Sequence, residues 1–189
     1  MKKIKSFIFI IFILAITPSS ANSNNNVLSI GSADAKITVK VFSSLTCPHC
    51  ANFHIKVISE IEKKFVKSGK VQIIFIDFPL DQAAFNASKL LNCIDQKNKM
   101  KFMDSIYKNQ DKWTSGSDLN TINNNLKKLL KDLNLNSIEF NKCLNNEKIS
   151  DKILVERIEA QKKYSISSTP TIIINEKKLD NADLESIKN

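Results

Sequence analysis

The sequence predicts an α/β fold with a central mixed β-sheet, helices on its flanks and an inserted α-helical subdomain. Two observations support this prediction. Strand-like apolar runs at residues 37–42, 71–76 and 171–175 lie near the two ends of the chain, whereas residues 81–165 have the periodicity of amphipathic helices. About 85 residues of helical periodicity are too many for one crossover connection between strands, so we expect a subdomain there.

The composition is that of one domain with a substantial core, because 42% of the 189 residues are hydrophobic. The formal charge is +9, but Lys2, Lys3 and Lys5 contribute three of these charges and precede the expected mature chain. Arg157 is the only arginine, and basic and aromatic residues do not alternate as they do in many nucleic-acid-binding proteins. We therefore expect no nucleic acid among the partners.

Residues 1–21 have the pattern of a secretory signal peptide, with lysines near the start, an apolar run at 7–16 and small residues at 19–21. An uncleaved membrane anchor is the alternative, but an apolar run of about ten residues is half of the roughly 20 needed to span a bilayer. We expect cleavage, and a mature protein in the periplasm or another extracytoplasmic space, where disulfides persist.

The first half of the sheet-containing core is expected at residues 34–80, after an N-terminal linker at 22–33 that includes a short edge strand. Ile37, Val39 and Val41 alternate with polar residues, which is the pattern of a strand. A second strand follows in an almost continuous apolar run, which is typical of a central strand covered on both faces.

Cys47-Pro48-His49-Cys50 lies between the first strand and a helix expected to run to about Lys67. Cys47 would be the N-cap and Pro48 the first helical residue, where a missing N–H costs nothing. Free backbone N–H groups and the positive end of the helix dipole then point at the Cys47 sulfur and favour its thiolate. Cysteines at such positions titrate at roughly 3.5–7.5 instead of about 8.5. Cys50, one turn further and more buried, would be the resolving thiol.

The inserted region, residues 81–165, is expected to form helices whose Leu, Ile, Met and Phe stripes belong to the core. The second half of the sheet-containing core follows at residues 166–189. The expected helices span residues 85–97, 100–109, 121–133, 137–144, 148–164 and 183–188, and the expected strands span 171–175 and 177–179.

Thr169-Pro170 precedes the last apolar strand, and a proline at the start of a strand is compatible with a sheet. Taken alone, this bond would be a trans turn, because only about 5–6% of X–Pro bonds are cis. The Thr169-Pro170 bond is informative because of the order of the elements around it. A strand, a CxxC motif, a helix, a strand and then a proline before another strand is the order found in the thioredoxin fold.

The chain resembles the DsbA-like thiol:disulfide oxidoreductases, a branch of the thioredoxin superfamily with a helical insertion. The resemblance extends from about Asp34 to Leu179, and a secretory leader agrees with it. The range of cysteine pKa values quoted above includes DsbA and thioredoxin, so it describes the family rather than this chain. The segments that carry the resemblance are Cys47-Pro48-His49-Cys50, Asp77-Phe78-Pro79-Leu80, Ala87 to Trp113, Phe140-Asn141-Lys142-Cys143-Leu144 and Ser168-Thr169-Pro170-Thr171.

The resemblance implies a thioredoxin fold in which Thr169-Pro170 is cis and lies beside the Cys47 sulfur. The missing N–H of Pro170 would leave a neighbouring backbone group free to pair with a substrate strand. Cys47 would form a mixed disulfide that Cys50 resolves. No cofactor is expected beyond the redox-active Cys47–Cys50 disulfide, and no metal.

We therefore expect an extracytoplasmic thiol:disulfide oxidoreductase that donates disulfides to newly secreted, unfolded proteins. The physical argument is linkage, because a fold that stabilises the Cys47 thiolate stabilises the reduced form and makes the disulfide an oxidant. A membrane protein of the DsbB type would reoxidise it, and the protein would be a monomer.

One residue departs from the family pattern. Many relatives carry a buried acid six residues before the first cysteine, where it serves proton transfer at the buried thiol. This sequence has Val41 at that position. The route by which Cys50 gains and loses its proton is therefore open.

The other two cysteines, Cys93 and Cys143, each lie in an expected helix of the insertion. Some DsbA-like relatives pair cysteines at these places, so in an oxidising compartment we expect a structural disulfide. The chain-entropy model gives roughly 4 kcal/mol for a loop of this size. The alternative is two buried free thiols that behave as small apolar residues.

Pro48 and His49 are expected to tune the active-site pair, since they stand between its cysteines. A protonated His49 would add a second positive charge beside the sulfur. His54 follows the motif by four residues, and its place on the helix favours a surface or packing role over catalysis.

Three other functions remain possible on the sequence. A copper or zinc site at Cys47, Cys50 and His49 or His54 would lack the four ligands of a usual structural zinc site. An isomerase or reductase would use the same thiols, but isomerases of this superfamily usually add an N-terminal dimerisation domain, for which the chain before residue 34 is too short. A catalytically idle binding module would not require both cysteines.

Overall fold

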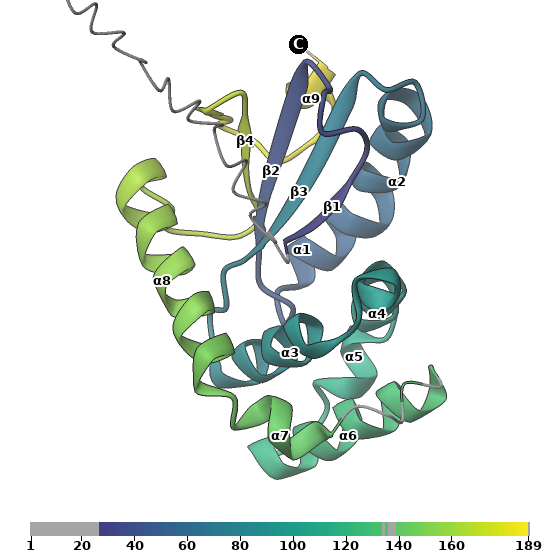
Figure 1. Ribbon diagram of the computed structural model, residues 1–189, viewed down its shortest axis with the longest axis vertical. Coiled ribbons are helices and arrows are strands. Elements are labelled where there is room, and N and C mark those ends of the chain that lie inside the picture. The colour runs from purple at the N-terminus through teal and green to yellow at the C-terminus, as the bar shows by residue number, and fades with distance from the viewer. Residues whose placement is uncertain (1–26, 134, 136–138, 189) are drawn as a thin grey trace, which may run out of the picture.

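The computed structural model describes residues 27–133, 135 and 139–188, and Figure 1 shows their arrangement. A five-stranded mixed sheet has the order β1-β3-β2-β4-β5. Strand β3 runs parallel to β2, whereas β1 and β4 are antiparallel to their neighbours. The strands are β1 (Leu28–Ile30), β2 (Ile37–Ser43), β3 (Val71–Asp77), β4 (Thr171–Ile174) and β5 (Lys177–Lys178).

Helices cover both faces of the sheet, and a group of helices forms the half of the molecule below it in Figure 1. A continuous helical segment (α1, η1, α2 and η2) packs on one face, with wider π-type turns in η1 and η2. Helix α8 lies along the other face. The helical elements are α1 (Pro48–Asn52), η1 (Phe53–Ile58), α2 (Ser59–Ile61), η2 (Glu62–Val66), α3 (Gln82–Cys93), α4 (Gln96–Lys108), α5 (Gln110–Trp113), α6 (Leu119–Asp132), α7 (Phe140–Leu144), α8 (Glu147–Tyr164) and α9 (Leu184–Lys188).

The alternation of side chains along β2 divides the core into two clusters. Val39 and Val41 point to the face covered by α1 and α2 and join the larger cluster, which continues into the helices of the lower half. Phe42 points to the opposite face, where it packs with Ile173 of β4 and Ala160 of α8 in the smaller cluster. Because β3 lies between β1 and β2 and is covered on both faces, both its odd and its even positions are apolar except Gln72 and Asp77, as the sequence predicts.

The α/β fold expected from the sequence is confirmed, with helices α3 to α8 lying between β3 and β4. Some helix boundaries expected in this region are wrong, and one helix was missed. The helix expected at 85–97 ends at Cys93, because Ile94 is extended and the next helix begins at Gln96. A short helix, α5, was not expected and follows α4 after Asn109.

The predicted leader at 1–21 lies outside the described residues. Within residues 27–133, 135 and 139–188, no helix combines the length and the apolar character that a membrane span requires.

Candidate active site

The site begins where β2 ends and α1 starts. Cys47 is extended, with φ −77° and ψ 119°, and is the N-cap of α1, while Pro48 occupies the first helical turn. The backbone N–H of Cys50 donates to Cys47 Sγ over 3.4 Å. The sulfur thus receives one of the amide donors that a helix start leaves free, at the positive end of the helix dipole.

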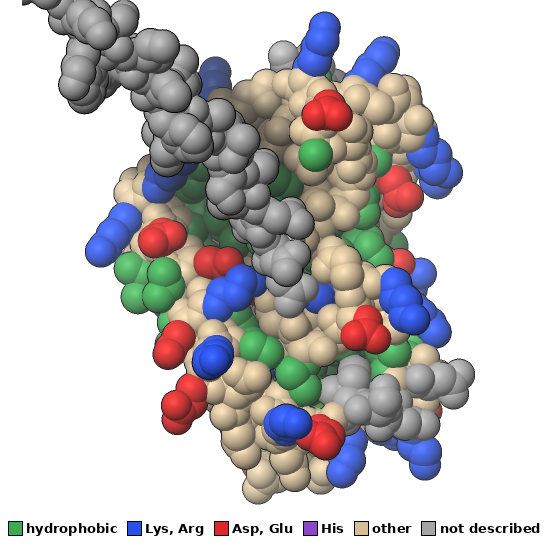
Figure 2. Space-filling view, viewed as in Figure 1, with side chains coloured by type: hydrophobic (Ala, Val, Ile, Leu, Met, Phe, Trp, Pro, Cys, Tyr) green, Lys and Arg blue, Asp and Glu red, His purple; other side chains and the backbone are tan. Residues whose placement is uncertain are grey.

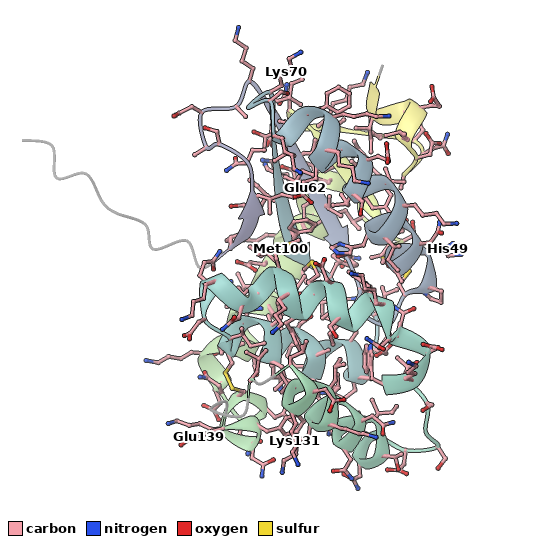
Figure 3. All side chains as sticks on the ribbon, turned by 90° about the vertical axis from the view of Figure 1, so that its right-hand side faces the viewer. His49, Glu62, Lys70, Met100, Lys131 and Glu139 are labelled. Atoms are coloured by element: carbon pink, nitrogen blue, oxygen red, sulfur yellow. A yellow bond between two sulfur atoms is a disulfide. The ribbon has the colours of Figure 1, made fainter. Side chains whose placement is uncertain are left out.

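The loop before β4 approaches the same sulfur from the other side. The Thr169-Pro170 bond is cis, and the Cys47 thiol donates to the Thr169 carbonyl oxygen over 3.3 Å. A groove of about 340 Å³ lies beside this contact and is lined by His49, Pro170 and Asp183, among others. Figure 3 shows His49 at the edge of the molecule, so the groove is open to solvent next to the cysteine pair.

The two cysteines differ in exposure. Cys47 is 8% exposed and Cys50 is 2% exposed, and their sulfurs are not bonded to each other. Burial raises the pKa of the Cys50 thiol to about 12, although interactions with the Thr169 side chain and the Ser44 backbone oppose the rise. Cys50 therefore holds its proton at neutral pH, and Cys47 is the more accessible nucleophile.

The inserted helices hold the turn that carries Cys47. Gln110 of α5 is buried, and its amide nitrogen donates to the carbonyl oxygens of Leu45 and Cys47 over 2.8 and 3.1 Å. The Thr46 hydroxyl donates to Asp81 over 2.6 Å, and Asp81 also caps α3. These contacts were not predicted. The cap at Asp81 has a sequence signal in its residue type, whereas Gln110 has none.

His54 is buried, so of the surface or packing role that the sequence favours, the packing role applies. Its Nε2 lies 2.7 Å from Asp104 Oδ1, and its ring packs against Phe75 and Tyr107 with centroids 5.9 and 4.8 Å apart. Val41 is 3% exposed and part of the apolar core, so no acid faces Cys50 from that position.

Cys93 and Cys143 form a disulfide between α3 and α7, with their Cα atoms 5.9 Å apart. Figure 3 shows the sulfur–sulfur bond near Glu139, on the opposite side of the molecule from His49. This pair is therefore a cross-link within the helical region, separate from the active-site thiols. Among the described residues, no three His, Cys, Asp or Glu side chains are grouped as metal ligands.

Comparison with known proteins agrees with this geometry. A family model described as Thioredoxin matches residues 23–189. A relative from Rickettsia bellii, named as a protein-disulfide oxidoreductase, is 29% identical over 169 residues, or 87% of this chain. Disulfide bond formation protein D of Bacillus anthracis is also 29% identical over 169 residues and is covered over 74% of its length. The chain spans 62% of the length of the Rickettsia relative.

The structure of Wolbachia pipientis alpha-DsbA1 superposes with a TM-score of 0.76 and 30% identity, covering 87% of this chain and 88% of that protein. The match includes the sheet and the helices inserted between β3 and β4, and so extends well beyond the CxxC motif. The chain therefore belongs to the thioredoxin family and has the fold of its DsbA-like branch.

Proposed function

We propose that this protein is a thiol:disulfide oxidoreductase that passes a Cys47–Cys50 disulfide to thiols of unfolded proteins. The observation that carries the proposal is the pairing of a capped sulfur with a more deeply buried one on the first turn of the same helix. A substrate thiolate attacks Cys47 Sγ, the Cys47–Cys50 bond breaks, and Cys50 leaves with the electron pair. A second substrate thiolate then displaces Cys47 and completes the substrate disulfide.

The direction of the reaction follows from the environment of Cys47. An amide donor and the end of a helix dipole stabilise its thiolate, which exists only when the pair is reduced. Stabilising the reduced form makes the disulfide more oxidising. A donor of disulfides is therefore favoured over a reductase, and the names of the Rickettsia and Bacillus relatives agree.

The test is equilibrium with glutathione, followed by transfer to a reduced, unfolded protein that has several cysteines. We expect a Cys47–Cys50 potential well above that of thioredoxin, about −270 mV, and rapid oxidation of the substrate. Cys50→Ala should accumulate a mixed disulfide through Cys47, because the resolving thiol is absent. A potential near that of thioredoxin, or faster reshuffling of scrambled disulfides than oxidation of thiols, would favour the reductase or isomerase instead.

We further propose that the protein works outside the cytoplasm as a monomer and that a membrane protein of the DsbB type reoxidises it. The reaction would need no cofactor beyond the disulfide. The expected leader and the stable disulfide between Cys93 and Cys143 both suit an oxidising compartment. Fractionation of cells and light scattering of the purified protein test the compartment and the oligomeric state.

A further inference from the structure

The buried thiol needs a route for its proton, and the question arises from the proposed function. When the Cys47–Cys50 bond breaks, Cys50 leaves as a thiolate in a site where burial strongly favours the thiol. When the bond re-forms, Cys50 must lose that proton before it attacks. Val41 has no group that could supply or accept a proton, and Cys50 itself is 2% exposed to solvent.

Tyr107 places a hydroxyl group in this region. The residue is 3% exposed, and its hydroxyl oxygen is buried without a hydrogen bond of normal geometry to any described residue. Burial and the nearby Cys50 sulfur raise the pKa of the phenol, whereas a side-chain interaction with Ser43 opposes the rise, and Asp77 adds to it. The hydroxyl therefore stays neutral, with Cys50, Ser43 and Asp77 as its polar neighbours. A neutral hydroxyl can donate one proton while it accepts another.

Asp77 supplies a half-buried acid at the end of β3. It is the register partner of Ser43, the last residue of β2, so the two lie side by side in the sheet. Ser43 and Asp77 come two residues after Val41 and Phe75 on their strands, so their side chains lie on the same face of the sheet. This is the face that carries α1. Asp77 accepts hydrogen bonds from the Ser88 hydroxyl and the Asn92 amide, each over 2.8 Å.

The charges around Asp77 suit a group that exchanges protons. Burial raises the pKa of this carboxyl; the two hydrogen bonds and the Lys152 charge oppose the rise, and Glu156 reinforces it. Lys99 of α4 also faces the carboxylate. All of these side chains line one cavity of about 450 Å³, together with Ser43. Apolar residues make up most of the lining, and these charged groups are where water in the cavity would bind and exchange protons with the acid.

We propose that the hydroxyls of Tyr107 and Ser43 relay the Cys50 proton to and from Asp77, so that the acid acts from β3 instead of from position 41. On bond closure, the proton leaves Cys50 Sγ for Tyr107 Oη, the phenol proton passes through Ser43 to Asp77, and the freed Cys50 sulfur attacks Cys47. On bond opening the sequence reverses and Cys50 is protonated. Tyr107 exchanges the proton with Cys50 directly, whereas Asp77 acts through the two hydroxyls and is a positioning residue.

The neighbouring His54 does not complete an equivalent path. It contacts Tyr107 through the ring planes, and its Nε2 is bonded to Asp104. Asp104 is 44% exposed, so this pair opens toward solvent on the helix side rather than toward the cavity lined by Asp77.

The experiment isolates the step in which Cys50 loses its proton. Reduced full-length protein is mixed with increasing oxidised glutathione, quenched rapidly with acid and analysed by mass. The phase that depends on glutathione reports the attack by Cys47, and the concentration-independent phase reports closure by Cys50. We expect Tyr107→Phe and Asp77→Asn each to slow closure by about 10-fold or more, within the range of general acid–base catalysis, while the first phase is unchanged.

The pH profile distinguishes a relay from a distorted site. In the two variants the rate of closure should rise close to tenfold per pH unit from pH 5 to 8, because hydroxide must then remove the Cys50 proton. The wild-type rate should depend less steeply on pH. Tyr164→Phe and Asp111→Asn are matched controls outside the path and should close at the wild-type rate. Thermal unfolding checks each fold, and Tyr107→Phe alone decides the test if Asp77→Asn does not fold.

Closure at the wild-type rate in Tyr107→Phe would overturn the relay and leave the proposed function standing. Loss of both phases by the same factor would also overturn it, because that pattern indicates distortion around Cys47. A wild-type protein that shows no glutathione-dependent phase would contradict the proposed function itself, and the relay with it.

Discussion

Gln110 shows how a single side chain can connect two parts of the molecule. It comes from the inserted helices, yet its amide nitrogen binds two carbonyl groups of the turn that presents Cys47. The Cys47 carbonyl also accepts the backbone N–H of Ala51 at the helix start, so the amide adds a second bond there and binds the Leu45 carbonyl in the preceding turn. A buried carbonyl without a partner is costly. The amide therefore fixes the backbone just before the helix start that polarises the sulfur.

Replacing Gln110 by Leu should destabilise the protein by about 2 kcal/mol, because two buried hydrogen bonds are lost at about 0.5–1.5 kcal/mol each. Urea denaturation of the oxidised protein measures this. Gln82→Leu is the matched control, since Gln82 is exposed and bonds only its helical neighbour Asn86 among the described residues. An equal loss of unfolding free energy in the two variants would show that the hydrogen bonds from Gln110 to the turn contribute nothing of their own.

The residues of the site differ in how far sequence could predict them. Cys47 to Cys50 are contiguous, and their chemistry follows from their place at a strand-to-helix junction. Gln110 and Tyr107 come from helices about 60 positions away, and no local pattern indicates that an amide or a phenol will meet the cysteines. Such contacts depend on how the inserted helices dock, which periodicity alone does not determine.

At the scale of elements, the disulfide between Cys93 and Cys143 joins α3 to α7. Replacing both cysteines by alanine should lower the free energy of unfolding by about 4 kcal/mol, because the unfolded chain loses a cross-link that closes a loop of 50 residues. Denaturation of the purified variant measures this, and Cys93→Ala alone should cost the same. A double variant within about 1 kcal/mol of the wild type would contradict the prediction.

Glu176 ties α8 to the hairpin formed by β4 and β5. It bonds Lys40, Lys163 and the Tyr164 hydroxyl, and the hydrogen bonds from Lys163 and then Lys40 lower its pKa from 4.5 to about 2. The pKa is lower in the folded state, so the stabilisation is fully present above about pH 4.5 and is lost as the pH falls toward 2. The side chain is 53% exposed, so solvent screens the interaction.

Glu176→Gln should therefore be less stable than the wild type at pH 7 and equally stable near pH 2. Unfolding measured at several pH values gives the difference between the two proteins, which should shrink between pH 4.5 and 2. Glu62→Gln is the control, because Glu62 lies in η2, away from this cluster. A difference for Glu176→Gln that stays constant over this range would mean that the carboxylate is not the source of the effect.

Element positions were more predictable than element ends. Apolar periodicity located the helices of the insertion but set their starts too late, because it marks the first buried residue, whereas the capping residue lies a few positions earlier. Asp81, Asp118 and Asn146 each accept a hydrogen bond at a helix start that precedes the predicted one. The short helix α5 was missed because Asn109 leaves helical geometry between α4 and α5.

At the scale of the whole molecule, the formal charge of +9 does not form one positive field on the face that Figure 2 shows. Basic and acidic side chains are interleaved there over the helices and the edge of the sheet. A dispersed charge suits the proposed exchange with many different unfolded chains, since it neither steers nor repels any one of them strongly.

The redox state of one pair of sulfurs should change the stability of the entire fold. If the folded protein favours the reduced pair, a thermodynamic cycle requires that the reduced protein is more stable than the oxidised one, because in the unfolded chain neither state has this environment. A helix terminus can stabilise a charge by up to about 2 kcal/mol, and a hydrogen bond to a charged group by about 1.5–3 kcal/mol. At least about 2 kcal/mol raises Tm by about 4–8 °C in a chain of this size.

We therefore expect the protein with a reduced Cys47–Cys50 pair to melt about 4–8 °C or more above the oxidised protein at pH 7. The Cys93–Cys143 disulfide must stay intact in both samples; Cys143 is 5% exposed, and alkylation followed by mass analysis verifies its state. In Cys47→Ser no thiolate forms at the helix start, so this variant should melt below the reduced wild type. An oxidised protein that melts higher than the reduced one would mean that the fold favours the disulfide, and a donor of disulfides would then lack its driving force.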